Sequence, residues 1–151
     1  MPRHFSGIDE LKSNVGEHIG YSEWHQITQE QVNTFAEATG DHQWIHVDVE
    51  RATAGPFGGP IAHGYLTLSM GPMFSPQILT VGDISMGVNY GLNKVRFMSP
   101  VPVGANLRMG AKLVSVDDIA GGAQVTMEFV FETEGAAKPS CVAECVFRYY
   151  K

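Results

Sequence analysis

The second half of the chain alternates apolar and polar residues with a period of two. The alternation runs through residues 106–113, 123–132 and 141–149, and residues 84–97 form a fourth extended candidate. Such a period is typical of antiparallel strands with one face buried. Turns rich in glycine, proline or aspartate separate the four stretches. The second half is therefore predicted to form four long antiparallel strands.

The first half has the periodicity of helices joined by loops. Residues 8–14 predict a short helix, and residues 21–27 predict a short strand. The segment Thr28-Gln29-Glu30-Gln31 is a capping box, which predicts a helix that ends at Gly40. Asp48 is placed to cap a further short helical turn.

Residues 61–74 are apolar on nearly every side, which predicts a buried helix. One buried helix followed by four long antiparallel strands predicts an α+β architecture with a hot-dog shape. In this shape the antiparallel sheet wraps around a central helix. A length of 151 residues fits a single domain, residues 1–151.

Composition narrows the class of protein. The chain is 44% hydrophobic and 17% charged, which excludes a disordered chain. No apolar run reaches the length of a membrane span, and the first residues lack the apolar core of a signal peptide. We therefore expect a cytoplasmic protein with no membrane partner. The net charge of −6 argues against nucleic acid as a partner.

Two features of the second half concern ligands and redox state. Cys141 and Cys145 share the apolar face of one predicted strand, too far apart to bridge, and are interpreted as buried free thiols. The basic residues gather in this half, which is where a phosphorylated ligand is expected, although solvated strand faces explain each one singly. These basic residues include Lys94, Arg96, Arg108, Lys112, Lys138 and Arg148.

Asp41 and His46 stand five residues apart in a loop-like segment between two helices. A carboxylate and an imidazole brought together can hold and deprotonate one water. An aspartate after Gly40 is also a common turn residue, so spacing alone leaves both interpretations open.

A metal site is the competing interpretation of this segment. His42 and His46 are four residues apart, with Asp41, Asp48 and His63 near in sequence. Zinc ligation at this spacing needs a helix that presents both imidazoles on one face. Because Gly40 argues against a helix here, we expect no metal.

Gly64 lies at the expected start of the buried helix, after a glycine- and proline-rich loop. An N–H in the first helical turn has no intrahelical partner, and the helix dipole favours negative charge there. Such an N–H can stabilise an oxyanion. A glycine needed for close packing is the alternative. The loop lacks the Gly-Lys-Ser/Thr ending of a Walker phosphate loop.

Two motifs together resemble the R-specific enoyl-CoA hydratases of the MaoC-like dehydratase family. Residues 40–46, Gly-Asp-His-Gln-Trp-Ile-His, match the family's Asp-x-Asn-Pro-Leu/Ile-His at the Asp, the aliphatic residue and the His. Residues 60–64, Pro-Ile-Ala-His-Gly, match its second motif fully, and Phe97 with residues 100–104 resembles its aromatic-to-Pro-Val turn. Gln43 replaces the motif Asn and Trp44 the motif Pro.

The resemblance implies a hot-dog lyase that hydrates a trans-2-enoyl-CoA to the (R)-3-hydroxyacyl-CoA in fatty acid metabolism. It implies Asp41 as general base, and His46 as the residue that orients the water and supplies the α-proton. Gly64 would be the oxyanion donor, and Gln43, Trp44 and His63 would belong to the substrate-binding set, with Trp44 along the acyl or pantetheine passage. The family implies a homodimer, an acyl-CoA partner and no cofactor beyond the coenzyme A of the substrate.

Three alternatives remain open at the level of sequence. They are a dehydratase acting on 3-hydroxyacyl chains of an acyl carrier protein, a hot-dog acyl-CoA thioesterase, and a non-catalytic acyl-binding partner subunit. The acidic net charge is unfavourable for docking an acidic carrier, which favours coenzyme A. Retention of both Asp41 and His46 favours an enzyme.

Overall fold

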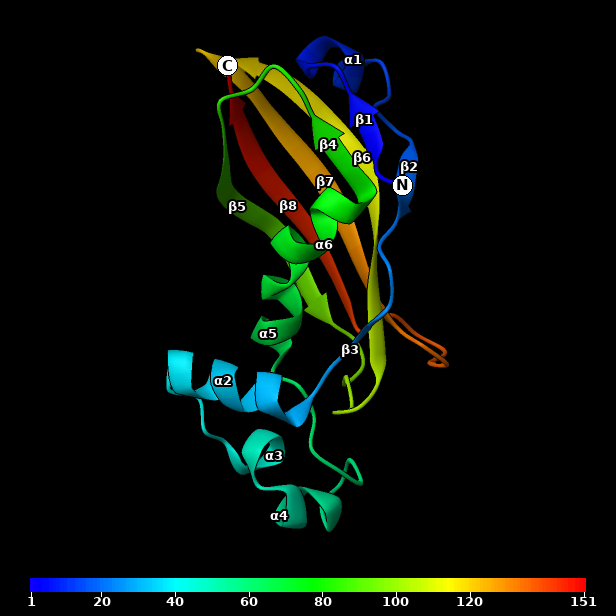
Figure 1. Ribbon diagram of the computed structural model, residues 1–151, viewed down its shortest axis with the longest axis vertical. Coiled ribbons are helices and arrows are strands. Elements are labelled where there is room, and N and C mark those ends of the chain that lie inside the picture. The colour runs from blue at the N-terminus through cyan, green and yellow to red at the C-terminus, as the bar shows by residue number, and fades with distance from the viewer.

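A computed structural model describes all 151 residues and has one curved antiparallel sheet as its main layer (Figure 1). Its strand order is β2-β6-β7-β8-β5, and β3 also pairs with β6. The strands are β2 (His18–Tyr21), β3 (His25–Gln26), β5 (Met86–Phe97), β6 (Asn106–Ile119), β7 (Gly122–Thr133) and β8 (Cys141–Tyr150). The four long strands predicted from the alternation are confirmed.

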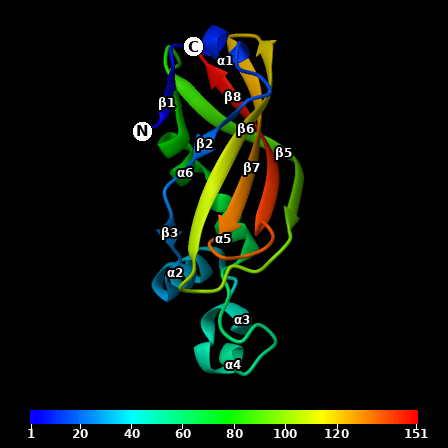
Figure 2. The same ribbon diagram turned by 90° about the vertical axis from the view of Figure 1, so that its right-hand side faces the viewer.

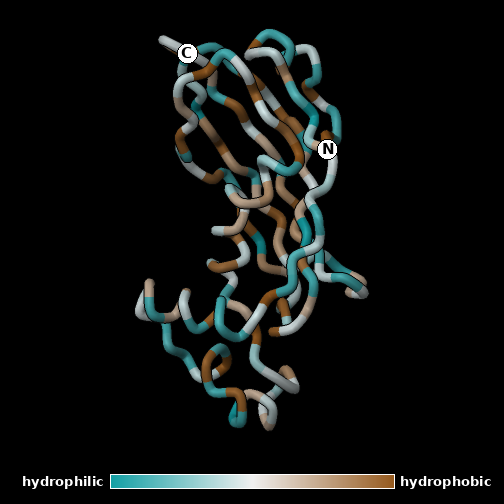
Figure 3. Tube along the Cα trace, viewed as in Figure 1, coloured by the Kyte–Doolittle hydropathy of each residue, from teal (hydrophilic) through white to brown (hydrophobic).

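The alternation explains which face of the sheet is buried. Every second residue over 107–113 of β6, 123–131 of β7 and 141–145 of β8 joins a hydrophobic core of 24 buried residues, while most intervening positions are more polar. Figure 3 shows hydrophobic and hydrophilic positions alternating along these strands. Cys141 and Cys145 both belong to this core as free thiols, as predicted.

The central helix differs from the prediction, because it is two short helices instead of one. They are α5 (Gly64–Ser69) and α6 (Gly71–Ile78), which meet at Met70. Pro72 explains the break, since proline lacks the N–H and its ring clashes with the carbonyl four residues earlier. The helical segment is also not buried on all sides, because the apolar residues Tyr65 and Met73 are exposed. Residues 61–63 precede the helix, and Ile61 forms a bridge with Pro102.

The predicted strand over residues 21–27 is also wrong as a single element. The chain there forms β2 and β3, which both pair with β6 but are separated by an irregular segment. Ser22 holds this segment to β6, because its N–H donates to the Met109 carbonyl and its hydroxyl accepts from the Met109 N–H. The backbone N–H and carbonyl of Met109 therefore both keep hydrogen-bond partners where β2 and β3 are interrupted.

The capping box is half formed. Thr28 caps α2 (Gln29–Thr39) by accepting the Gln31 N–H at 3.1 Å. The Gln31 side chain is hydrogen-bonded to His25 instead of reaching back to Thr28. Gly40 ends the helix in the left-handed region at φ 81°, where a residue without Cβ is favoured.

The remaining elements close the two ends of the molecule. At one end, α1 (Ile8–Lys12) lies beside a parallel pair that was not predicted, β1 (Arg3–Phe5) with β4 (Leu79–Val81). At the other end, α2, α3 (Trp44–Val47) and α4 (Val49–Thr53) gather below α5 (Figure 2). The α5 and α6 helices lie along the concave side of the sheet, which is the hot-dog fold.

Strand β5 has an unusual environment. It pairs with β8 along one side only, so its other edge is free. Nearly every residue of β5 is exposed, including large apolar side chains on both faces. These exposed side chains are Met86, Val88, Tyr90, Leu92 and Phe97. The extended segment predicted over residues 84–97 is confirmed as β5, and this strand is more exposed than β6, β7 and β8 because it lies at the edge of the sheet.

Candidate active site

Asp41 lies just beyond the end of α2, in the turn that leads to α3. The left-handed Gly40 turns the chain out of the helix, so the Asp41 side chain is exposed. Its carboxylate Oδ1 accepts the Gln43 N–H at 3.2 Å. The other carboxylate oxygen makes no hydrogen bond within the chain.

His46 is buried and helical, which corrects the expectation of a polar loop. It lies on α3 and is 6% exposed. Its Nδ1–H donates to the Ile61 carbonyl at 2.7 Å, and the Ile61 N–H donates to the Ile45 carbonyl at 3.0 Å. Its own carbonyl accepts from the Gln29 side chain at 2.8 Å. The α3 turn is therefore held by α2 and by the segment before α5.

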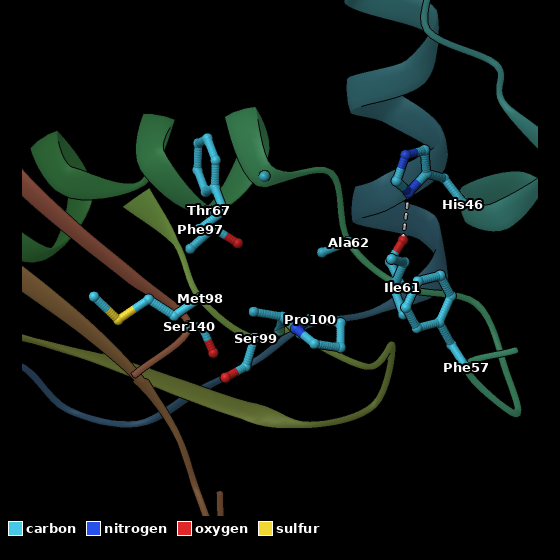
Figure 4. A pocket seen from close by; sticks show the side chains of 12 residues that line it. His46, Phe57, Ile61, Ala62, Thr67, Phe97, Met98, Ser99, Pro100 and Ser140 are labelled. Atoms are coloured by element: carbon cyan, nitrogen blue, oxygen red, sulfur yellow. Dashed lines mark hydrogen bonds between the residues drawn. The ribbon is translucent and has the colours of Figure 1, made fainter. Parts of the chain in front are cut away.

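The hydrogen bond to Ile61 fixes the tautomer of His46. A carbonyl only accepts, so the proton of a neutral His46 ring must sit on Nδ1. Nε2 then carries the free lone pair, and any second proton must be on Nε2. His46 lines a pocket, and its ring meets that pocket at one end (Figure 4).

His63 is the most buried of the three residues, at 2% exposed. Its Nε2–H donates to the Asp41 backbone carbonyl at 3.0 Å. Its ring stacks on His46 with centroids 3.9 Å apart and planes at 23°, and the Phe35 ring lies 4.8 Å away. Burial lowers the pKa of His63, which keeps this imidazole neutral.

Asp41, His46 and His63 together form the cluster most similar to a metal site, because their candidate ligand atoms all lie within 4.8 Å. A zinc ion must lie in the plane of each ligating imidazole, about 2.0–2.1 Å from nitrogen. The stacked rings are nearly parallel, so their planes do not meet near the nitrogens. The arrangement fits an acid–base site better than a metal site.

Gly64 is the first residue of α5, and its N–H makes no backbone hydrogen bond. It lines the same pocket as His46. A Cβ at this position would lie 3.0 Å from the Phe97 ring, so the aromatic ring packs directly on the glycine. The packing interpretation and the oxyanion interpretation of this glycine therefore both have a structural basis.

The pocket has a volume of about 270 Å³ and lies between the start of α5 and the loop after β5. Figure 4 shows His46 and Phe57 at one end of it and Met98 and Ser140 at the other. Thr67 lies on the same face of α5 as Gly64, three residues later, and the sequence reasoning missed it although this spacing was available. The residues that line this pocket are His46, Phe57, Ile61, Ala62, Gly64, Thr67, Phe97, Met98, Ser99, Pro100, Val101 and Ser140.

A second cavity of about 370 Å³ lies farther along the seam between the helices and β5. Its walls are mostly apolar, and α5, α6, β5, β7 and β8 all contribute to it. The residues that line it are Leu68, Ser69, Gly71, Pro72, Asn89, Tyr90, Gly91, Leu92, Phe129, Cys145 and Phe147. The sequence alone did not predict this cavity.

Gln43 and Trp44 lie next to the site but do not line its pocket. Gln43 precedes α3, and its carbonyl accepts the His46 N–H at 3.0 Å. The Trp44 ring packs under the Arg51 guanidinium at 4.3 Å and against Gly55. Both residues shape the turn that carries His46, and their contact with substrate stays a prediction.

Fold and site together define a hot-dog protein with an Asp/His pair at the start of its central helix. The sequence model of the MaoC like domain matches residues 10–134, and the chain therefore belongs to the MaoC-like dehydratase family. No helix is long and apolar enough to cross a membrane.

Several known proteins are similar to this chain in sequence or in structure. The 3-hydroxyacyl-thioester dehydratase Z of Mycobacterium tuberculosis is 53% identical over 148 residues, which are 97% of this chain and 98% of the relative. A monoamine oxidase regulatory protein from Archaeoglobus superposes with a TM-score of 0.81 at 26% identity, covering 100% of this chain and 98% of the other. An R-hydratase from Pseudomonas aeruginosa has a TM-score of 0.76 at 23% identity, covering 96% and 86%, which shows a common fold.

Proposed function

We propose that this protein is a hydro-lyase that adds water reversibly to a trans-2-enoyl-CoA and forms the (R)-3-hydroxyacyl-CoA. The observation that carries the proposal is that His46 and Gly64 line one pocket, while an Asp41 carboxylate oxygen lies within 4.8 Å of a His46 ring nitrogen. The names of a dehydratase relative and of an R-hydratase with the same fold support it.

The proton transfers follow from the chemistry of the pair. In hydration, Asp41 takes a proton from the attacking water as the hydroxyl bonds to the β-carbon. His46, which starts with a proton on each ring nitrogen, then gives its Nε2 proton to the α-carbon; the pair is reset when Asp41 releases its proton to solvent and His46 Nε2 takes one up. Because its Nδ1–H is bonded to Ile61, the transferable proton is the one on Nε2. Dehydration reverses both transfers, with the Nε2 lone pair accepting the α-proton and protonated Asp41 assisting loss of hydroxide as water.

Gly64 supplies the electrostatic part of the proposal. The thioester carbonyl would accept its N–H at the start of α5, where the helix dipole also favours negative charge. Charge grows on that oxygen as water attacks, so the donor acts mainly on the transition state. No cofactor is needed, since the coenzyme A belongs to the substrate.

The second cavity fits the acyl tail in this scheme. It follows the α5–β5 seam away from Gly64, and its apolar lining suits a hydrocarbon chain. The net charge of −6 is unfavourable for an acidic carrier protein, so coenzyme A is the proposed carrier of the acyl group.

A homodimer is part of the proposal. Strand β5 offers twelve residues of free edge, and its exposed apolar side chains have no cover in one chain. Such an edge is suited to pairing with a second copy. Light scattering at micromolar concentration should give twice the mass of 16.5 kDa, and a mass of one chain would contradict the dimer.

The decisive experiment is incubation with a trans-2-enoyl-CoA of medium length. The absorbance of the conjugated double bond should fall, and chiral analysis should give the R isomer of the 3-hydroxy product. An S product would refute the stereochemistry. Free coenzyme A as the main product would mean a thioesterase, and an unchanged spectrum would refute the activity.

A further inference from the structure

We infer that His63 is a positioning residue that holds both members of the catalytic pair: it anchors the Asp41 backbone through Nε2–H and supports the His46 ring by stacking. The inference rests on the proposed hydration. The sequence motif implied that His63 contacts the substrate. The structure points instead to a role in holding the two catalytic residues.

Burial separates His63 from the substrate. The residue is 2% exposed and is absent from the lining of the pocket that holds His46 and Gly64. Phe35 packs near its ring, so the imidazole lies between α2 and α3 and does not face the pocket. An effect of His63 on catalysis must therefore pass through its neighbours.

The hydrogen bond to Asp41 is one of those routes. Asp41 lies in a short exposed turn, where its side chain is bonded only to the Gln43 N–H, within the same turn. The 3.0 Å bond from His63 ties this turn to a residue 22 positions away, directly before α5. It therefore couples the position of the carboxylate to the helix start that carries Gly64.

The stacking on His46 is the second route. The two rings must hold opposite tautomers, because His46 donates from Nδ1 to Ile61 while His63 donates from Nε2 to Asp41. His63 Nδ1 is buried without a partner, so a second proton there would be costly. His63 thus supports the ring of His46 while itself remaining uncharged.

Two substitutions separate these contributions. His63→Gln keeps an N–H donor at a similar reach, whereas His63→Phe keeps an aromatic ring but removes the donor. We expect kcat of the His63→Phe variant to fall by about 10–100-fold, the scale of a displacement near 1 Å, with KM changed by less than about threefold. The His63→Gln variant should recover kcat in part, because it restores the donor to Asp41 but not the ring that stacks on His46. If the His63→Phe variant is folded and has the wild-type kcat, the inference is wrong.

A double-mutant cycle tests whether the effect passes through Asp41. In an Asp41→Asn background, most of the loss from His63→Phe should disappear, because the misplaced group is already disabled. Full multiplication of the two losses would refute the positioning role and indicate general damage. Phe is bulkier than His, so a second cycle combines His63→Gln with Asp41→Asn. In this cycle, the further loss of kcat caused by His63→Gln should be small.

Imidazole ¹⁵N spectra give a readout that does not depend on activity. At neutral pH, His63 should show protonated Nε2 and bare Nδ1. The opposite tautomer, or a charged ring, would refute the inference even if hydration is confirmed. A wild-type protein inactive on enoyl-CoA but with this tautomer would refute the proposed function and leave the anchoring intact.

Discussion

The Gly64 N–H can be removed by a single substitution, but the structure requires a corrected control. Gly64→Pro removes the donor, and His63 before it has φ −60° and ψ 140°, a conformation compatible with a following proline. No helical hydrogen bond is lost at this first position. Gly64→Ala keeps the donor, yet its Cβ would lie 3.0–3.2 Å from three atoms of the Phe97 ring.

Phe97→Ala removes this conflict, since all three of the close atoms lie beyond Cβ and are then missing. We therefore compare Gly64→Ala and Gly64→Pro in a Phe97→Ala background, where both carry a Cβ at position 64 and differ in the donor. Loss of one oxyanion donor costs about 10²–10³ in turnover, or about 2.7–4 kcal/mol. The turnover of the proline double variant should be lower than that of the alanine double variant by that factor.

The assay is the initial rate of enoyl-CoA hydration at saturating substrate, with circular dichroism to show that each variant is folded. A small difference between the alanine and proline double variants would mean that Gly64 provides space instead of a hydrogen bond. The oxyanion donor would then be sought at the next N–H along α5, that of Tyr65, which also makes no backbone hydrogen bond.

Three further predictions concern the pair, the thiols and the acyl cavity. Asp41→Asn should lower turnover by about 10²–10⁴-fold without changing the melting temperature, because the carboxylate is exposed, whereas His46→Gln should lower both, because the ring is buried and bonded. Burial raises the pKa of Cys141 to about 11 and that of Cys145 to about 12, so at a pH of about 8 both should stay protonated and resist a thiol reagent until urea unfolds the chain; rapid labelling of native protein would contradict this. Leu92→Trp should fill the second cavity and lower kcat/KM for ten-carbon substrates by at least about tenfold relative to four-carbon ones, since each buried methylene contributes about 0.8 kcal/mol; an unchanged ratio would place the tail elsewhere.

Sequence patterns predicted those elements that depend on neighbouring residues in the chain. The alternation in β6, β7 and β8 comes directly from burial of one face, and Gly40 and Thr28 end and begin α2 by their own conformations. The break before Pro72 also had a local cause, and the prediction gave too much weight to the apolar run around it.

Other features depend on contacts between distant residues, which periodicity cannot reveal. The pairing of β1 with β4 joins Phe5 to Val81, and the bond from His63 to Asp41 joins two motifs. Burial of His46 depends on the Ile61 carbonyl. The motifs named the chemical groups of the site, whereas the tautomers and the stacking required the fold.

The central helix is divided at Met70. The division separates the position of Gly64 from the shape of the second cavity, which a single continuous helix would couple. Gly64 lies in the first turn of α5, whereas Gly71 and Pro72, which line the second cavity together with the last residues of α5, belong to α6. A side chain changed on α6 can shift that helix without moving Gly64, the proposed oxyanion donor, through a continuous ladder of backbone bonds. Selectivity for the length of the tail can therefore be altered, by evolution or by engineering, while the chemistry at the other end is preserved.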